Sequence, residues 1–185
     1  LMRPFARPPA RALAHYVSPL QPVPRTALLL AGFAEAKRVR VFRDGWSAGA
    51  QRFRPAVIGA AWDDLAALVR AWDPGWPKPA RAIVAFRCAG KPAAPPALRD
   101  LLWNTFGVPV FEQYLGPNLE LLAFECEAHD GLHLANAGVH DPGCALRTEL
   151  CACGNPTPRL CAVKKPQTAY NLPMAISSGE QPVLS

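Results

Sequence analysis

Residues 82–114, AIVAFRCAGKPAAPPALRDLLWNTFGVPVFEQY, predict a strand, a helix and a second strand in succession. Residues 82–86 are a short continuous apolar run, which is typical of a strand buried on both faces. The helix predicted over 97–106 places four large apolar side chains on one face: Leu98, Leu101, Leu102 and Phe106. Residues 108–114 supply the second strand. Because such a unit joins a parallel pair by a right-handed crossover, we predict an α/β fold with a partly parallel sheet.

The chain before this unit contains further elements of an α/β domain. WDDLAALVRAW at 62–72 is the clearest helix, because its large apolar residues recur at helical spacing. Residues 39–42 alternate Val-Arg-Val-Phe and predict a strand, and residues 54–59 predict another short strand. Residues 26–36 fit a helix or a buried strand equally well, because a short apolar run has no decisive period.

Proline marks both ends of the chain. The 21 prolines concentrate at the termini and in short linkers, where they break helices and favour extended segments. We therefore predict a Pro-rich N-terminal arm over 1–25, with a short helix over 10–16 left open, and an irregular C-terminal tail over 164–185. Residues 26–163 are predicted to form a single α/β domain with a zinc site within 126–153.

Charge and hydropathy exclude some classes of function. The formal net charge of +6 is mild for 185 residues, and the basic residues are spread singly, so we expect no nucleic-acid partner. The longest apolar run, 27–31, is far shorter than the roughly 20 residues that span a bilayer, so we expect no membrane partner. The first 34 residues lack the order of a cleaved targeting signal, and we expect a cytoplasmic protein.

The six cysteines indicate a metal site. In a cytosolic protein, clustered cysteines favour metal binding over a disulfide framework. In ECEAHDGLH at 125–133, a turn centred between His129 and Asp130 would put Cys126 directly opposite His133. Cross-strand partners hold their Cβ atoms about 4.5–5.5 Å apart, close enough for one metal ion to bind both side chains.

The segment CACG at 151–154 supplies the remaining ligands of a tetrahedral site. Cys151 and Cys153 can complete the site if the chain leaves the strand between them, and Gly154 permits that bend. Three thiolates and an imidazole favour a structural zinc ion over magnesium or calcium. His129, Cys144 and Cys161 remain alternative ligands.

The same motifs carry a resemblance to a known family. AGKPAAPPALRDLLWNTFGVPVFEQY at 89–114, ECEAHDGLH at 125–133 and CACGNPTPRL at 151–160 resemble the phenylacetate–coenzyme A ligase branch of the adenylate-forming enzymes. The branch carries Glu-Cys-x-x-x-Asp-Gly-Leu-His and later Cys-x-Cys-Gly-Arg-x-x-Pro-Arg. The resemblance covers roughly residues 81–161 and implies a zinc ion bound by Cys126, His133, Cys151 and Cys153.

The catalytic motifs of that family do not match this sequence. The Gly- and Ser/Thr-rich loop that grips the ATP phosphates has no match in this sequence, and we expect no counterpart of the family's C-terminal lid domain. The glutamate that helps hold magnesium falls on Asn118, and an amide is a weaker ligand for a hard cation. Lys91 stands where the family has an acid, and Glu120 could replace the lost magnesium ligand only at an offset of two positions. Only 17 residues separate His133 from Cys151, where the family has several tens of residues.

Two hypotheses of function follow from this sequence. The first is a non-catalytic, zinc-binding α/β protein derived from an acyl-adenylate-forming ligase, which acts as a subunit for a protein partner or a homo-oligomer. The second is an enzyme or accessory subunit that retains an aryl, acyl or nucleotide ligand in the remnant cleft near 114–118. The missing phosphate loop and acid favour the first hypothesis, so we predict no catalytic residues.

Overall fold

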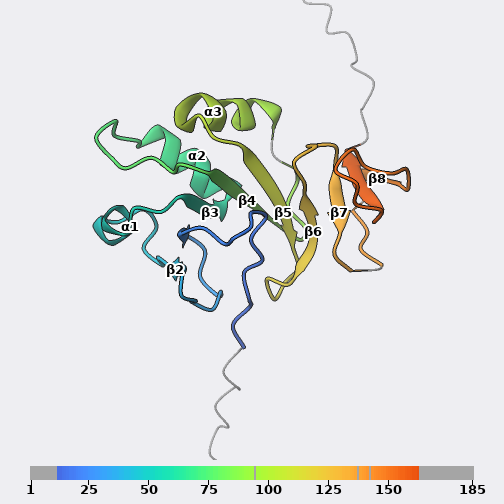
Figure 1. The fold of residues 1–185 in the computed structure, drawn as a ribbon, viewed down its shortest axis with the longest axis horizontal. Helices are drawn as coiled ribbons and strands as arrows, with labels where there is room; N and C mark the ends of the chain where they lie inside the picture. The colour runs from blue at the N-terminus through green and yellow to red at the C-terminus, as the bar shows by residue number, and fades with distance from the viewer. Residues whose placement is uncertain (1–11, 94, 137, 142, 163–185) are drawn as a thin grey trace, which may run out of the picture.

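A nine-stranded mixed sheet organises the part of the chain that the structure describes (Figure 1). The computed structural model describes residues 12–93, 95–136, 138–141 and 143–162. The strands lie in the order β2-β1-β3-β4-β5-β6-β7-β9-β8. The parallel strands are β1 (Thr26–Leu28), β2 (Val39–Val41), β3 (Val57–Ala61), β4 (Ala82–Cys88) and β5 (Val110–Leu115). The antiparallel strands are β6 (Leu121–Glu125), β7 (Leu132–Leu134), β8 (Cys144–Arg147) and β9 (Arg159–Ala162).

Three helices accompany the strands: α1 (Ala48–Phe53), α2 (Trp62–Arg70) and α3 (Pro96–Phe106). Strand β4, helix α3 and strand β5 form the predicted parallel unit, with Ile83 opposite Val110 and Cys88 opposite Leu115. Pro96 stands at the first turn of α3, where its missing N–H costs no hydrogen bond. The predicted fold class, α/β with a partly parallel sheet, is therefore confirmed.

Two apolar clusters cover the two faces of the parallel strands. On one face, strand residues such as Ile58, Ile83 and Val110 pack against α2 and α3. On the other face, Phe86 packs in a second cluster with residues of β1, β2, β3 and β5. Successive residues of a strand point to opposite faces of the sheet. The paired residues Val57 and Ala82 therefore belong to the second cluster, and the next pair, Ile58 and Ile83, belongs to the first.

The described part of the N-terminal arm, residues 12–25, lies against the second cluster and contains no helix. The open alternative of a helix over 10–16 is therefore wrong for residues 12–16. The arm is held by backbone hydrogen bonds between Ala14 and the segment 32–34, and by Gln113 Nε2, which donates to the Val17 carbonyl at 2.8 Å. Tyr16 contributes a side chain to the cluster, so an extended segment covers the face opposite α2 and α3.

Some predicted elements differ from those in the structure. The strand expected over 54–59 is β3 at Val57–Ala61, and the preceding residues form α1, which the sequence analysis did not predict. The ambiguous segment 26–36 contains the short strand β1. Beyond residue 136 the chain adds β8 and β9 to the sheet, two strands that the sequence analysis did not predict. The predicted tail, 164–185, lies outside the described residues.

No helix among the described residues is long and apolar enough to cross a bilayer.

Candidate metal centre

The hairpin that carries the first two candidate ligands has a different register from the one predicted. Strands β6 and β7 pair with Phe124 opposite His133 and Glu125 opposite Leu132. The prediction that Cys126 lies directly opposite His133 is therefore wrong by two residues. The reason is the turn: the His129 N–H bonds to the Cys126 carbonyl at 3.1 Å, and both His129 and Gly131 have positive φ. Cys126 thus lies beyond the end of β6, in the turn itself.

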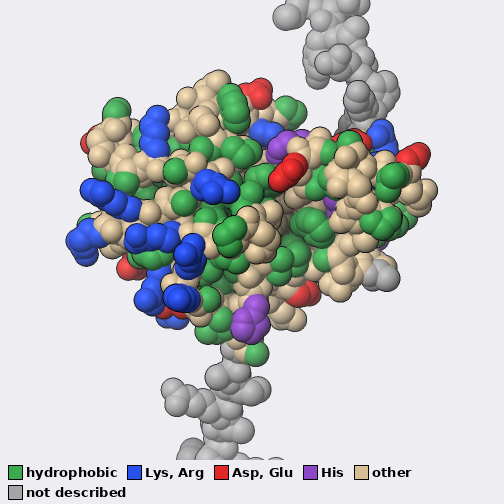
Figure 2. Space-filling view, in the orientation of Figure 1, with side chains coloured by type: hydrophobic (Ala, Val, Ile, Leu, Met, Phe, Trp, Pro, Cys, Tyr) green, Lys and Arg blue, Asp and Glu red, His purple; other side chains and the backbone are tan. Residues whose placement is uncertain are grey.

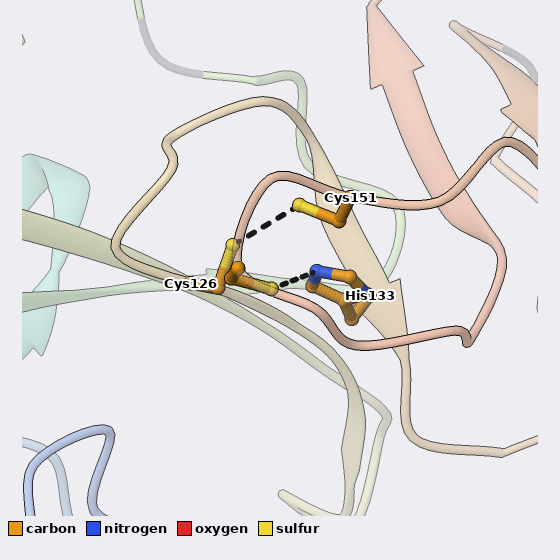
Figure 3. A group of neighbouring side chains, drawn as sticks. Cys126, His133 and Cys151 are labelled. Atoms are coloured by element: carbon orange, nitrogen blue, oxygen red, sulfur yellow. Dashed lines mark hydrogen bonds between the residues drawn. The ribbon is translucent and has the colours of Figure 1, made fainter.

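The structure nevertheless brings the four candidate ligands together. The ligand atoms of Cys126, His133, Cys151 and Cys153 all lie within 4.8 Å of one another. The Cys126 and Cys151 sulfurs are 3.6 Å apart, and Cys153 Sγ is 3.4 Å from His133 Nε2. In Figure 3, the Cys126 and Cys151 sulfurs and the His133 ring point toward a common space.

These separations fit a tetrahedral ion. Zinc–sulfur bonds of about 2.3 Å and zinc–nitrogen bonds of about 2.0–2.1 Å place the sulfurs about 3.8 Å apart, and a sulfur and a nitrogen about 3.6 Å apart. The two short distances in the cluster differ from these values by about 0.2 Å. The four side chains are therefore close enough to hold one metal ion.

A tight turn aims Cys151 and Cys153 at the same point. The Gly154 N–H bonds to the Cys151 carbonyl at 2.9 Å, and Gly154 has a φ of +81°, a conformation that side chains disfavour. The Asn155 N–H donates to Cys153 Sγ at 3.5 Å and helps to fix the position of that sulfur. The bend at Gly154 that the sequence suggested is present.

His133 is fully buried and is oriented by a residue that the sequence analysis did not single out. Its Nδ1 lies 3.1 Å from Thr157 Oγ1 and 3.2 Å from the Thr157 carbonyl, so Nδ1–H donates there and Nε2 is left for a metal. Asn155 Oδ1 in turn accepts from the Thr157 N–H and hydroxyl at 2.9 and 3.0 Å. Such outer contacts fix the tautomer of a ligating histidine. The turn-forming sequence NPTP at 155–158 was the available signal for them.

The two paired sulfurs have opposite electrostatic surroundings. Burial raises the pKa of the Cys126 thiol to about 11. The backbone N–H of Cys153 is the main cause that lowers the pKa of Cys151 to about 6. Cys151 is therefore a thiolate at neutral pH and the natural first ligand, whereas Cys126 must lose its proton when a cation binds.

The three alternative ligands lie apart from the four-residue group. His129 is 3.0 Å from Glu125 through Nδ1, and its ring stacks on Phe111. Cys161 points its sulfur toward the Asp130 carbonyl at 3.8 Å. Burial, followed by the nearby Asp141 carboxylate, raises the pKa of Cys144. None of them joins the group among the described residues.

Buried ion pairs anchor the hairpin to the parallel strands. Glu125 accepts from Arg99 Nη1 at 2.9 Å and from the Glu112 backbone N–H at 2.8 Å. Arg87, which is 3 % exposed, forms ion pairs with Glu112, with 2.8 Å between Nε and Oε1, and with Asp141. Because Glu125 directly precedes Cys126, this network fixes where the first ligand emerges.

A second buried arginine ties the two ligand-bearing turns together. Arg159 Nη1 donates to the Asp130 carbonyl at 2.8 Å and pairs with the Asp130 carboxylate. Its Nη2 donates to the Glu149 carbonyl at 3.2 Å, two residues before Cys151. Arg159 thus joins the turn after Cys126 to the loop that enters the Cys-x-Cys turn.

The segment 114–118, near which a remnant ligand cleft was expected, borders a small cavity at its Pro117–Asn118 end. Tyr114 is buried, and the Arg87 guanidinium lies 4.4 Å from the centre of its ring. A cavity of about 210 Å³ lies beside Asn118, below the roughly 300 Å³ of ordinary ligand pockets. Glu120, the possible replacement for the lost acid, accepts the Asn118 N–H at 2.9 Å and so caps the local turn.

No family model matches the chain, and no curated protein matches it. Among solved structures, the chain is similar to 2-hydroxyisobutyryl-CoA ligase, described in an open conformation in complex with 2-HIB-AMP and CoA, with 15 % identity and a TM-score of 0.47. The similarity covers 67 % of this chain and 38 % of that chain. A similarity of this size establishes neither a family nor an activity for this protein.

Proposed function

We propose that this protein is a non-catalytic, zinc-binding α/β protein derived from an acyl-adenylate-forming ligase, and that it acts as a partner-binding or structural subunit. The observation that carries the proposal is the convergence of Cys126, His133, Cys151 and Cys153 within 4.8 Å. The ligase ancestry is supported by the resemblance of the motifs that contain these residues, ECEAHDGLH and CACGNPTPRL.

The choice of zinc is supported by the chemistry of the donors. Soft thiolates and an imidazole in a tetrahedron suit zinc, whereas magnesium and calcium prefer oxygen ligands. All four positions are filled by protein side chains, which is the pattern of structural sites. A catalytic zinc would keep one position open for water or substrate. The ion would therefore hold the β6–β7 turn against the Cys-x-Cys turn.

The absence of nucleotide chemistry is supported by three internal differences from the ligases. Asn118 and Lys91 stand where the resembled motifs have acids. The Glu120 carboxylate, which could replace the lost magnesium ligand, accepts a hydrogen bond from the Asn118 N–H instead. The short connection between His133 and Cys151 leaves no room for the ligase segment that contacts ribose.

Partner binding is supported by the contrast between the two sheet edges. At β2, the edge is blocked locally, because Glu35 accepts the Val41 N–H at 3.0 Å and Ala36 bridges to Val39. At the other edge, β8 is followed by Leu150, which is 70 % exposed, and Leu146 within β8 is 56 % exposed. An open edge with exposed leucines is a ready surface for another chain.

Two measurements test this proposal. Elemental analysis of the purified protein should give one zinc per chain, and a value well below one would refute the metal assignment. Light scattering of the native particle, with Leu146→Asp and Leu150→Asp as matched variants, should show a loss of association without a loss of melting temperature. If neither variant changes the mass of the particle or the capture of its partner, the edge surface is not the binding surface.

The retained-ligand hypothesis is tested separately. The melting temperature should not change with ATP, AMP or aryl acids, because the cavity beside Asn118 is small. A saturable rise of several degrees with any of them would replace the non-catalytic proposal with the second hypothesis.

A further inference from the structure

Three arginines line up along one edge of the parallel sheet. Arg38, Arg25 and Arg81 each directly precede a strand, namely β2, β1 and β4. Consecutive backbone hydrogen bonds connect these positions, because Thr26 N–H bonds to the Arg38 carbonyl, Ala56 N–H to the Arg25 carbonyl, and Arg81 N–H to the Ala56 carbonyl. Neighbouring strands lie about 4.8 Å apart, so the row extends over about 14 Å.

Further basic residues extend this row into a patch. Lys37 neighbours Arg38, and Arg52 and Arg54 flank Phe53, whose ring lies 4.6 Å from the Arg25 guanidinium carbon. All six Lys and Arg side chains are exposed. We call these residues the arginine row: Arg25, Lys37, Arg38, Arg52, Arg54 and Arg81. Figure 2 shows Lys and Arg side chains gathered over the end of the molecule that carries α1 and β2.

The patch is not neutralised by nearby acids. Lys and Arg outnumber Asp and Glu by 12 to 5 over residues 12–93, whereas acids outnumber bases by 8 to 3 over residues 95–162. Within residues 12–81 the ion pair is between Arg40 and Glu35, and no acidic side chain of the described residues pairs with the arginine row. Asp73, an acid that follows α2, accepts the Gly75 N–H at 2.7 Å.

We propose that the arginine row binds the phosphate backbone of a double-stranded nucleic acid without reading its sequence. Protein partners normally meet an apolar interface core, yet residues 25–81, which carry the row, contain no exposed large apolar side chain. Stable attachment to a membrane surface requires a second, apolar signal, which the row does not offer. Interfaces with nucleic acid are polar and strongly positive, and guanidinium groups suit phosphate.

Duplex is favoured over single-stranded nucleic acid by the lack of stacking surfaces. Proteins that hold single strands stack the bases on exposed aromatic side chains. Phe53, the aromatic residue within the patch, is half-buried beneath Arg25. The residues of the row are scattered over positions 25–81 of the sequence. Because the basic residues look isolated there, the sequence analysis predicted no nucleic-acid partner.

The test is fluorescence anisotropy of a labelled 20-base-pair DNA duplex with the full chain at several salt concentrations. The variant Arg38→Ala/Arg81→Ala removes two charges from the row, and Arg25 is left unchanged because it packs on Phe53. The control Lys91→Ala/Arg147→Ala removes two exposed charges elsewhere. Both proteins keep the basic residues of 1–11 and 163–185, so the comparison isolates the row.

The row variant should bind the duplex about 60-fold more weakly at 0.1 M salt, and the slope of log affinity against log salt should fall by about 1.8. The control should change the affinity less than twofold. Equal losses in both variants, or no binding by the parent protein, would overturn the proposal. Tighter binding to polyglutamate, to anionic vesicles or to a single strand of the same length would also overturn it, in favour of that ligand.

Discussion

The parallel and antiparallel parts of the sheet are held together by different forces. Strands β1 to β5 bury apolar rows on both faces, and two large clusters account for their packing. Strands β6 to β9 share a smaller cluster centred on Tyr114, Ala123, Leu132 and Leu160. Around that cluster lie the candidate metal ligands and the buried charges of Arg87 and Arg159. The parallel part is therefore built on hydrophobic burial, and the antiparallel part on polar links that a metal would complete.

This difference predicts that the two parts respond to different perturbations. Apolar burial contributes about 25 cal/mol per Å² and needs no ligand. A structural zinc site contributes its binding free energy directly to folding, about 10–16 kcal/mol in zinc-finger peptides. Changes to the ligands should thus loosen β7 to β9 first, and changes to the apolar rows should loosen the parallel strands.

The largest effect is expected from Cys151→Ser. The variant removes the sulfur that is a thiolate at neutral pH, so it should retain well below one zinc per chain and lose several kcal/mol of stability. Hydrogen exchange measured by mass spectrometry should become fast over β7 to β9, while exchange in β3 and β4 stays slow.

The matched control for this variant is Cys88→Ser. Cys88 is a half-buried thiol at the end of β4 and lies outside the four-residue group. The Cys88→Ser variant should still bind one zinc per chain, and hydrogen exchange over β7 to β9 should stay slow. If Cys151→Ser and Cys88→Ser gave the same hydrogen-exchange pattern, metal binding would not be the interaction that stabilises strands β7 to β9.

A smaller effect, in the other part, is expected from Phe86→Ala. The Phe86 ring is 1 % exposed, lies 5.4 Å from the Phe33 ring in a tilted arrangement, and fills the space above Gly59. Truncation should lower the free energy of unfolding by about 3–5 kcal/mol, as for other buried aromatic residues. Urea titration would measure the loss, and chelator competition should show an unchanged zinc affinity. A weakened zinc affinity would mean that the two parts are not energetically separate.

The same contrast explains how much of the fold could be predicted from sequence. The strand at 82–86, the helix at 97–106 and the strand at 108–114 were predictable because apolar burial leaves a periodic signal. Strand β8 was not predictable, because four residues with mostly exposed side chains carry no period. The strand order was also out of reach, since it depends on contacts between distant segments.

The site shows a similar division. The residue types of Cys126, His133 and the Cys-x-Cys pair pointed to a metal because few other arrangements use them. The pairing of Cys126 with His133 was wrong, because left-handed backbone at His129 and Gly131 shifted the turn. The roles of Thr157 and Asn155 depend on hydrogen bonds made after folding, which spacing alone does not reveal.

A third prediction sharpens the comparison at the edge of the metal site. Thr157→Val keeps the shape of the side chain but removes the hydroxyl 3.1 Å from His133 Nδ1. The zinc affinity should fall by about 10- to 100-fold, as for other outer contacts of ligating histidines. Chelator competition measures this change, and Thr148→Val, at an exposed position, is the control. An unchanged affinity would show that the Thr157 carbonyl alone orients the ring.

The smallest effect is expected from the ion pairs between the two parts, and its sign depends on pH. Burial alone would raise the pKa of Asp141, but the Gly143 N–H and the Arg87 guanidinium outweigh it and hold that pKa below its usual 3.8. The charged Asp141 therefore contributes stability that is present above the unfolded pKa and lost as the pH falls through the folded pKa.

The pKa of Glu112 shifts in the opposite direction to that of Asp141. Burial is the main cause, and it raises the pKa of Glu112 above 4.5. Its contribution favours the folded state at low pH and declines as the pH rises through the unfolded pKa. The parent protein thus combines two opposing trends, and Asp141→Asn removes one of them. The difference in melting temperature between parent and variant should be largest at pH 7 and shrink below about pH 4. Because acid protonates the candidate metal ligands of both proteins alike, that difference isolates the ion pair. A difference that stays constant from pH 7 to pH 3 would mean that Asp141 acts through shape and hydrogen bonding, and not through its charge.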